Sequence, residues 1–304
     1  MSTESYYLGV DGGGSKTLAV VVDADGHERG RGRAGSANYA AVGLEQAVQN
    51  IHTAVQQAAH EVPCSLPFTK AWLGLAGVDR SSDAALLGSR VRDLATFVSV
   101  TNDADLLLSA LEGQAGSVLI VGTGSIALAR DSTGHVSRVG GWGYILGDEG
   151  SGYDIGRRGL QAAVRAADGR GKATSLLLSI VRHWQLRSVE DFIDVVYTAD
   201  NRAKIARVAP CVTLAARQGD SVASEIIEQA ASELALLVRT IAPAMSRLPL
   251  ALGGGLLLHD AFLRERVLHH IQQEQEIGPV VHVDHPALSA ACSARTLSPR
   301  EDKR

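Results

Sequence analysis

The sequence contains few of the residues on which several classes of protein depend. Aromatic side chains make up only 4% of its 304 residues, and there are only three cysteines. Cys64, Cys211 and Cys292 lie far apart, so they form neither a CxxC motif nor an even disulfide framework, and we expect reduced, mostly buried thiols. The ten histidines include no HExxH pattern and have no cysteine partners at zinc-ligand spacing, which argues against a structural zinc site.

An excess of positive charge and long apolar segments are also absent. Lys and Arg total 29 against 33 Asp and Glu, a net charge of -4, so the chain lacks the basic surplus that a nucleic-acid backbone requires. Charged residues or glycines interrupt the apolar runs well before the roughly 18 residues that a membrane span needs. The first four residues, MSTE, do not resemble the start of a signal sequence. We therefore expect a cytoplasmic protein with no nucleic-acid and no membrane partner.

Glycine, in contrast, is abundant, with 32 residues, and two glycine-rich segments share one plan. Residues 6–34 and residues 117–139 each begin with an apolar strand, continue into a glycine-rich loop and end in a hairpin. When Gly26 is aligned with Gly134, the offset is 108 residues (134 − 26), which indicates an internal duplication. Because glycine-rich hairpins are common, chance similarity is the alternative.

The rest of the chain predicts an α/β fold. Helical and strand patterns alternate between residues 44 and 111, residues 151–247 are almost wholly helical, and strands return at residues 248–252 and 280–283. Asp103 follows one predicted strand and precedes a helix. In open α/β sheets, this is the position at which ligands bind.

Residues 11–17, DGGGSKT, are the most informative segment. Consecutive glycines let backbone amides approach an anion, and the following Ser15, Lys16 and Thr17 add hydroxyls and a cation. This is not a Walker A loop, because Ser15 separates Gly14 from Lys16 and a strand follows. A plain tight turn is the alternative.

Residues 122–127, GTGSIA, formally match a dinucleotide-binding fingerprint. That interpretation requires a helix to open at the second glycine, whereas the sequence continues as a strand and a turn. A second phosphate-binding hairpin fits the pattern better.

Two further segments suggest a small-molecule site. Residues 140–152 contain six glycines, two carboxylates and two aromatic residues, which favours a loop around a polar ligand with Trp142 against an apolar sugar face and Asp148 binding hydroxyls. The alternative is a connector whose carboxylates cap the next helix. Residues 253–255, three glycines between a strand and a helix, either leave room for a nucleotide base or form a tight turn.

In this order, the DGGGSKT loop, the GTGS loop, the GGWG and GDEGS motifs and the late GGG resemble the BadF/BadG/BcrA/BcrD ATPase family, and within it the N-acetylglucosamine kinases. The similarity covers about residues 8–294. It implies the actin-like ATPase fold, in which two duplicated ribonuclease-H-like α/β domains enclose an interdomain active-site cleft. We expect residues 1–115 in the N-terminal domain, with a C-terminal helix at 286–304 packing back on it, and residues 116–285, with a helical insertion, in the other. Residues 285–291, HPALSAA, depart from the Gly-Ala-Ala pattern expected there.

The resemblance also assigns roles to individual residues. Asp103 corresponds to the catalytic base, and Asp11 would hold Mg²⁺ through a water molecule. The residues expected to bind the sugar are Asn38, Asp103, Gly141, Trp142, Gly143 and Asp148. Those expected to bind ATP are Gly12, Gly13, Gly14, Ser15 and Lys16 in the first phosphate loop, Gly122, Thr123 and Gly124 in the second, and Gly254 and Gly255 beside adenosine.

The implied function is ATP-dependent transfer of a phosphoryl group to the C6 hydroxyl of N-acetylglucosamine, giving N-acetylglucosamine 6-phosphate, with Mg²⁺ as cofactor. Nothing in the sequence determines the substituent at the sugar's 2-position, so glucosamine and N-acetylmuramic acid are alternatives. A non-catalytic sugar or ATP sensor and an ATPase activator with an iron–sulfur cluster are alternatives of another class. The scattered cysteines argue against the activator, and the retained Asp11, Asp103 and Asp148 argue against the sensor. We also expect a homodimer.

Overall fold

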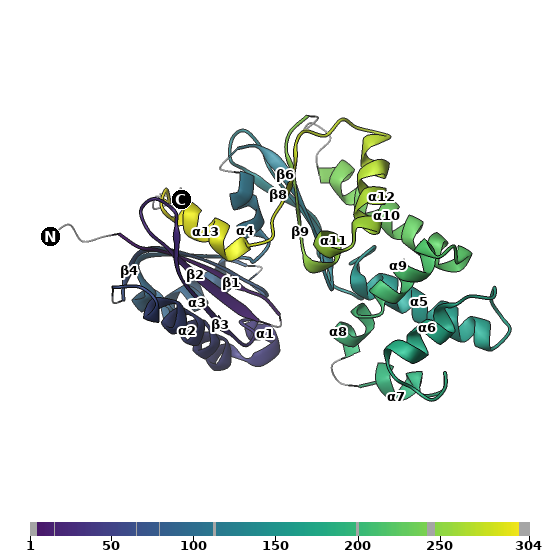
Figure 1. Cartoon of the computed structure of the whole chain (residues 1–304). Helices are drawn as coiled ribbons and strands as arrows, with labels where there is room; N and C mark the ends of the chain where they lie inside the picture. The colour runs from purple at the N-terminus through teal and green to yellow at the C-terminus, as the bar shows by residue number, and fades with distance from the viewer. Residues whose placement is uncertain are drawn as a thin grey trace. The chain divides into compact units, whose positions relative to one another are not determined.

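The computed structural model describes residues 5–14, 16–64, 66–78, 80–111, 114–198, 201–241 and 247–297 (Figure 1). The chain divides into two compact units: Met1–Gly113 with His285–Arg304 form the first, and Gln114–Asp284 form the second. Among the described helices, none combines the length and the apolar character that a membrane crossing would require.

The first unit is built on a five-stranded sheet. The strand order is β3 (Glu28–Ala34), β2 (Thr17–Val22), β1 (Tyr7–Gly12), β4 (Phe68–Leu75) and β5 (Ala95–Thr101). The central strand β1 pairs antiparallel with β2, to which a short loop joins it, and parallel with β4, which in turn runs parallel to β5. The carboxyl ends of β1, β4 and β5 therefore lie at one edge of the sheet.

One face of this sheet is covered by α2 (Leu44–His60). Its buried Ile51 and Ala54 join a core cluster that includes Ala19 and Val21 of β2. The apolar residues of α2 recur at helical spacing, so a single stripe of the helix faces the sheet. Shorter helical segments complete this unit: α1 (Tyr39–Val42), α3 (Ser81–Arg90), η1 (Arg92–Leu94), α4 (Asp105–Leu108) and η2 (Ser109–Leu111).

The opposite face is covered by the last helix of the chain, α13 (Pro286–Ala294). Successive strand residues point to opposite faces, so Val20 and Val22 of β2 face away from α2 and pack with Ala287 and Ala291 of α13. The helix ends at Ala294, within the segment 286–304 that the sequence assigns to this unit. Residues 298–304 lie outside the described residues.

The second unit repeats the sheet of the first. The strand order is β8 (Val136–Gly140), β7 (Ser125–Arg130), β6 (Gly116–Val121), β9 (Leu250–Gly253) and β10 (Val280–His282). Its central strand β6 pairs antiparallel with β7 and parallel with β9, as β1 does with β2 and β4. Identical strand order and direction confirm the predicted α/β fold of two duplicated ribonuclease-H-like units.

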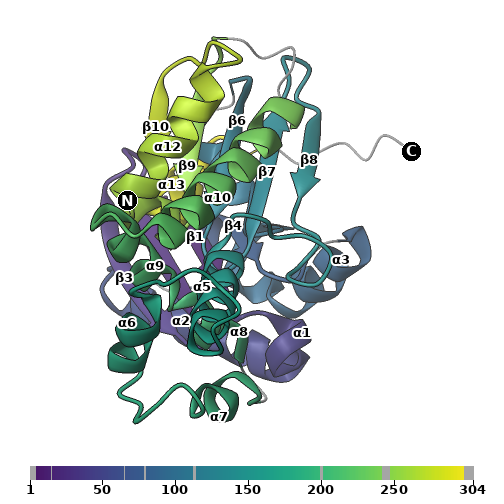
Figure 2. The ribbon, with the colours of Figure 1, turned by 90° about the vertical axis from the view of Figure 1, so that its right-hand side faces the viewer.

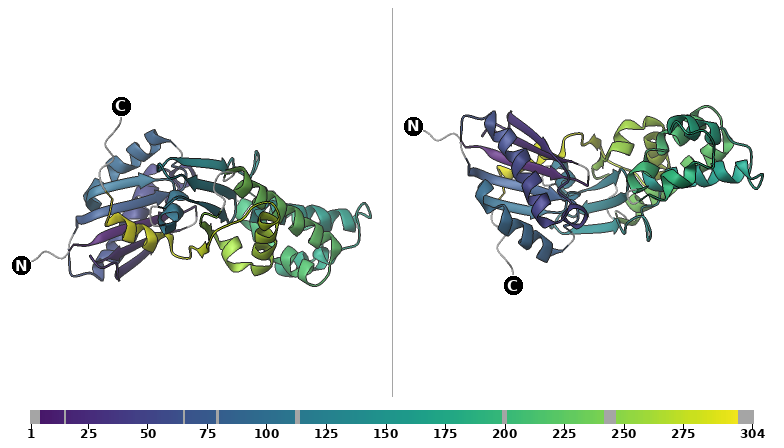
Figure 3. Two further views of the ribbon diagram at one scale, coloured as in Figure 1. Left: turned by 90° about the horizontal axis from the view of Figure 1, so that it is seen from above. Right: turned by 90° about the horizontal axis from the view of Figure 1, so that it is seen from below.

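Helices make up most of the remaining second unit, as the sequence predicts (Figures 2 and 3). The longest, α10, packs against β6, β7 and β8 and against three other helices, and it contributes nine buried residues to the core. These helices are α5 (Gly152–Ala167), α6 (Leu176–His183), α7 (Phe192–Val196), α8 (Asn201–Ala206), α9 (Ala209–Arg217), α10 (Ser221–Ile241), α11 (Gly255–His259) and α12 (Ala261–Gln272).

Candidate active site

The parallel strands of the first unit bring two candidate carboxylates to one edge of the sheet. Asp11 of β1 lies opposite Gly74 of β4, and Gly74 lies opposite Thr101 of β5. Asp103 follows two residues after Thr101, in the turn that leads into α4. Asp11 and Asp103 therefore project from the same, ligand-binding edge of an α/β sheet.

The first glycine loop, residues 12–16, leaves this edge at the end of β1. Gly13 N donates to Lys16 O at 2.9 Å, which closes the loop, and Ala76 N after β4 donates to Gly12 O at 2.8 Å. Gly14 is exposed, with open space where a side chain would be, so a ligand can reach the backbone there. Ser15 lies outside the described residues.

Asp11 has the character of a cation ligand. Burial raises the pKa of its carboxyl group, and the positive charge of Lys16 only partly opposes that rise. A divalent cation would offset the cost of keeping this carboxylate charged, and Mg²⁺ prefers oxygen ligands of this kind. The residues present therefore fit the predicted metal.

Asn38 lies beside the same loop. Ser36 Oγ donates to Gly13 O at 3.2 Å, and Ala37 N donates to the same oxygen at 3.3 Å. Asn38 caps α1, its Oδ1 accepting from Ala40 N at 3.1 Å, and a Cβ at Gly77 would lie 2.8 Å from that Oδ1. The amide Nδ2 of Asn38 has no partner among the described residues, which leaves a donor for a ligand.

The turn after β5 fixes the orientation of Asp103. Its Oδ1 accepts from Ala104 N at 3.0 Å, and Oδ1 of the preceding Asn102 accepts from the same amide at 2.9 Å. Asn102 Nδ2 donates to Val78 O at 3.3 Å, which ties this turn to the one after β4. The half-buried carboxylate of Asp103 is thus held at the same sheet edge as Asn38 and Asp11.

In the second unit, the second glycine loop, residues 122–124, joins β6 to β7. Gly122 N donates to Gly124 O at 2.9 Å. The N-terminus of α5 abuts the loop, because Gly152 N donates to Gly122 O at 2.9 Å and Tyr153 N donates to Thr123 O at 3.2 Å. The positive end of a 16-residue helix dipole therefore points at this loop, an arrangement that favours phosphate.

The late glycines lie against the second glycine loop. Gly254 follows β9 with φ +84°, and a Cβ there would lie 2.5 Å from Val121 O, so only glycine fits. A Cβ on Gly122 would approach Gly255 N to 3.9 Å. The structure thus brings together two of the segments predicted to bind ATP.

Asp148 lies beneath the second glycine loop rather than in an open pocket. It is only 3% exposed; its Oδ1 accepts from Ser125 N at 3.2 Å and its Oδ2 from Arg202 Nη2 at 2.9 Å. Burial raises the pKa of this carboxyl, and the Ser125 amide and Arg202 oppose the rise. Through its contact with Ser125, Asp148 supports the second glycine loop. A direct contact between Asp148 and the sugar stays a prediction.

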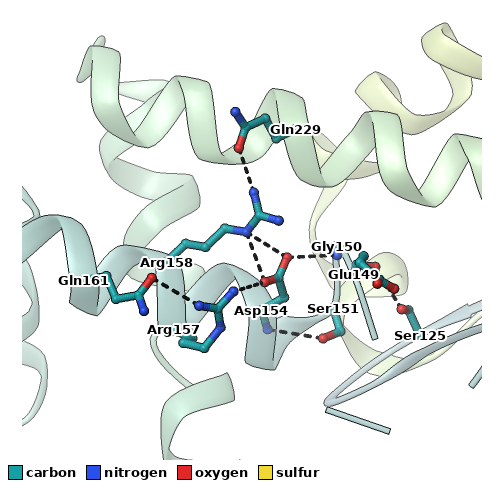
Figure 4. Close-up of polar contacts among 9 residues, drawn as sticks. All are labelled: Ser125, Glu149, Gly150, Ser151, Asp154, Arg157, Arg158, Gln161 and Gln229. Carbon is teal, nitrogen blue, oxygen red and sulfur yellow. Dashed lines mark hydrogen bonds and ion pairs between the residues drawn. The ribbon is translucent and has the colours of Figure 1, made fainter. Parts of the chain in front are cut away.

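The alternative in which Asp148 and Glu149 cap the next helix is wrong. Ser151 caps α5, since its Oγ accepts from Asp154 N at 3.2 Å. Glu149 contributes through its backbone, accepting from Ser125 Oγ at 2.9 Å (Figure 4). The segment therefore holds β7 and the start of α5 together.

Trp142 is the more exposed of the two aromatic residues in the glycine-rich segment, with 66% of its surface accessible against 43% for Tyr144. Gly141 and Gly143 on either side adopt φ of +70° and +82°. The Arg138 guanidinium lies 5.0 Å from the centroid of the Trp142 ring. This exposed ring is the type of surface that stacks on a sugar.

Arg202 on α8 is a site residue that sequence reasoning missed. Besides its ion pair with Asp148, its guanidinium lies 5.3 Å from the Tyr144 ring centroid, and its buried Nε has no hydrogen-bond partner in the described chain. It lies 54 residues after Asp148 in a helical segment with no motif. No pattern in the sequence could have singled it out.

Comparison with known proteins agrees with this geometry. The model of the BadF/BadG/BcrA/BcrD ATPase family matches residues 8–291. The chain belongs to this family. Membership in an ATPase family bears out the predicted use of ATP.

Three proteins are similar to this chain over most of its length. An N-acetylmuramic acid/N-acetylglucosamine kinase of Clostridium acetobutylicum is 33% identical over 84% of this chain and 89% of its own. An N-acetyl-D-glucosamine kinase of Dictyostelium discoideum is 30% identical over 96% and 98%. The crystal structure of a candidate N-acetylglucosamine kinase from Chromobacterium violaceum is 28% identical, covers 96% of this chain and 99% of its own, and superposes with a TM-score of 0.82.

Proposed function

We propose that the protein is an ATP-dependent kinase that phosphorylates N-acetylglucosamine to N-acetylglucosamine 6-phosphate. The observation that carries the proposal is the Asp103 carboxylate, held with Asn38 at the carboxyl edge of the first sheet, in a chain whose curated relatives are amino-sugar kinases, two of them named for N-acetylglucosamine. These relatives confirm the predicted enzyme class, a phosphotransferase with an alcohol acceptor.

In this mechanism, Asp103 accepts a hydrogen bond from the C6 hydroxyl and takes its proton as the phosphoryl group is transferred. Asn38 Nδ2 donates to the sugar, and Trp142 supports its apolar face. The first and second glycine loops bind the phosphates through backbone amides, while Gly254 and Gly255 leave room for adenosine. Catalysis then consists mainly of positioning both substrates and offsetting charge.

Asp11 would hold Mg²⁺ through a water molecule. The bound metal supplies charge neutralisation on the transferring phosphoryl group. The protein itself contributes the Asp11 carboxylate. Burial makes the charged form of this group costly, so a bound cation would stabilise it, and Lys16 lies beside it.

The structure adds an observation against an iron–sulfur activator. Cys64 follows α2, Cys211 lies on α9 and Cys292 lies on α13, so no two of these free cysteines share an element. Closely placed cysteines, as an iron–sulfur cluster requires, are therefore not found on any one element of the described chain. We also propose a cytoplasmic homodimer, which resemblance to sugar kinases supports; light scattering after size-exclusion chromatography tests the dimer.

The other substrates to consider are glucosamine and N-acetylmuramic acid, because one relative is named as a glucosamine kinase and another is named for N-acetylmuramic acid as well. A coupled ADP-release assay with Mg·ATP and N-acetylglucosamine, N-acetylmuramic acid, glucosamine or glucose tests the proposal directly. Turnover on N-acetylglucosamine is expected. Turnover on none of the four, with ATP still bound, would instead support a sensor.

Asp103→Asn tests the assignment of the base. The variant should lower kcat by about 10²- to 10⁴-fold, the usual contribution of a general base, and keep sugar and ATP affinity. Asp25→Asn, in the exposed first hairpin, is the matched control and should retain native kcat. Near-native turnover by Asp103→Asn would show that another group removes the proton.

A further inference from the structure

A cationic pocket lies in the helical part of the second unit, where α5 and the segment after it face α10. Its volume is about 640 Å³, within the range of small-molecule sites. Five positively charged side chains and one carboxylate, Glu225, line it. The cations are Arg157, Arg158, Arg165, Arg170 and Lys172.

This pocket is separate from the second glycine loop. Gly152, the first residue of α5, contacts that loop. The pocket residues of α5, Arg157 to Arg165, lie five to thirteen residues further along the same helix, which at 1.5 Å per residue is about 8 to 20 Å away. None of the residues assigned to ATP or sugar lines the pocket.

Two of the arginines are held in place by a network around a buried carboxylate (Figure 4). Asp154 accepts from Arg157 Nη2 at 2.8 Å and from Arg158 Nε at 3.0 Å. Arg158 Nη1 also donates to Gln229 Oε1 of α10 at 2.6 Å, and Arg157 Nη1 to Gln161 Oε1 at 3.1 Å. Both guanidinium groups are therefore held at one carboxylate when no ligand is bound.

The pocket contains more cationic side chains than carboxylates to pair with them. Arg170 pairs with Asp168 and Lys172 with Glu225. The exposed side chain of Arg165 has no hydrogen-bond or ion-pair partner among the described residues. Even with Asp154 and Asp168 counted, cations outnumber carboxylates by five to three, so the pocket favours an anion.

The lining residues also indicate which other chemical groups the anionic ligand has. Ala162, Val222 and Ile226 form an apolar patch between the cations, and Glu225 can accept hydrogen bonds from hydroxyl groups. Arginine side chains bind phosphate oxygens through two parallel N–H donors. A phosphate group attached to a hydroxylated ring fits all three features.

We propose that this α5–α10 pocket binds a phosphate monoester of a small hydroxylated metabolite, and that binding is transmitted to the segment before α5. The link is Asp154, whose Oδ2 accepts from Gly150 N at 3.2 Å while its carboxylate holds both arginines. A phosphate that draws Arg157 and Arg158 toward itself competes with Asp154. The Gly150 contact, two residues beyond Asp148, then loosens.

Calorimetric titration of the full chain tests the site without requiring catalysis. Inorganic phosphate, N-acetylglucosamine 6-phosphate and AMP are titrated with Mg·ADP saturating, so that phosphate groups already occupy the glycine loops. If N-acetylglucosamine 6-phosphate binds more tightly than inorganic phosphate, the ligand is a phosphosugar. If AMP does, the ligand is a nucleotide. No binding of any of the three would overturn the proposal.

Arg165→Glu isolates the pocket, because this exposed, unpaired side chain can be changed without disturbing the core. Replacing one charged donor by a carboxylate should weaken phosphate-ester binding by about tenfold or more. Arg182→Glu, an exposed arginine of α6 outside the pocket, is the matched control and should bind as the native chain does. Equal affinity in all three proteins would overturn the site.

Hydrogen exchange tests the transmission. Adding the tightest-binding ester should speed exchange of the Gly150 amide in the native chain and in Arg182→Glu, and leave it unchanged in Arg165→Glu. Unchanged exchange in the native chain, with the ester bound, would overturn the link through Asp154.

Discussion

At the scale of single residues, Gly254 shows how a close contact between two backbone segments restricts a position to glycine. Gly254→Ala would force a left-handed backbone on alanine and bring its Cβ against the Val121 backbone. We expect the free energy of unfolding to fall by about 1–3 kcal/mol, with a lower Tm in thermal denaturation. Gly255→Ala next to it, where the structure leaves open space, should melt close to the native Tm. If both variants melt together, β6 and the turn after β9 are further apart than described.

The raised pKa of Asp11 makes the free energy of unfolding depend on pH. Because burial raises its pKa, the folded state binds more protons than the unfolded state between the ordinary Asp pKa and the raised one. The free energy of unfolding contributed by this group therefore falls as the pH rises through that window. Without metal, Asp11→Asn should melt a few degrees above the native chain at pH 7 and lose this advantage below the ordinary Asp pKa, about 3.9.

The same variant should lose most of its Mg²⁺-dependent turnover. Asp25→Asn provides the comparison, since it removes an exposed carboxylate and should keep native turnover. A native melting temperature for Asp11→Asn at every pH would mean that the Asp11 carboxylate is not penalised by burial.

At the scale of elements, α13 completes the first unit. A Cβ at Gly9 of β1 would collide with the backbone of Ala287 and Ala291, so the helix lies directly on the sheet. Lys70 Nζ anchors the chain beyond the helix by donating to Leu297 O at 2.6 Å. A chain truncated after Asp284 should lose hydrogen-exchange protection in β1 and β2 and keep it in β6 and β9.

The control for this experiment is truncation after Leu297, which keeps α13 and the Lys70 contact and should preserve protection in both sheets. Full protection of β1 and β2 without α13 would show that the helix is not needed to cover them.

Elements were predictable where hydrophobic periodicity is strong and the turns have distinctive residues. The pattern of β1, its glycine loop and β2 identifies the first hairpin, and the spacing of Leu44, Val48 and Ile51 identifies α2. The cap of α5 was not predictable, because Asp148 and Ser151 are both favoured capping residues and only the backbone path selects Ser151. The Asp148–Arg202 pair likewise depends on how α8 packs.

At the scale of the whole molecule, the duplication was visible in sequence only through its hairpins. The offset of 108 residues relates β1 and β2 to β6 and β7, and the two sheets have the same order throughout. The later strands carry no comparable signal, because two helices, α1 and α2, separate β3 from β4, whereas six helices, α5 to α10, separate β8 from β9 in the described chain. The α5–α10 pocket within that insertion has no sequence motif, since its cations come from separate turns of α5 and the segment after it.

The return of α13 to the first sheet also sets the order in which the protein can be completed during translation. Residues 114–284 contain every part of the second unit, so the whole sequence of this unit is synthesised before α13. The first unit waits for α13, and until then Val20 and Val22 have no cover. A nascent chain therefore presents an apolar strand face from its oldest part, the kind of surface that chaperones bind. The part that is made first is the last to be finished.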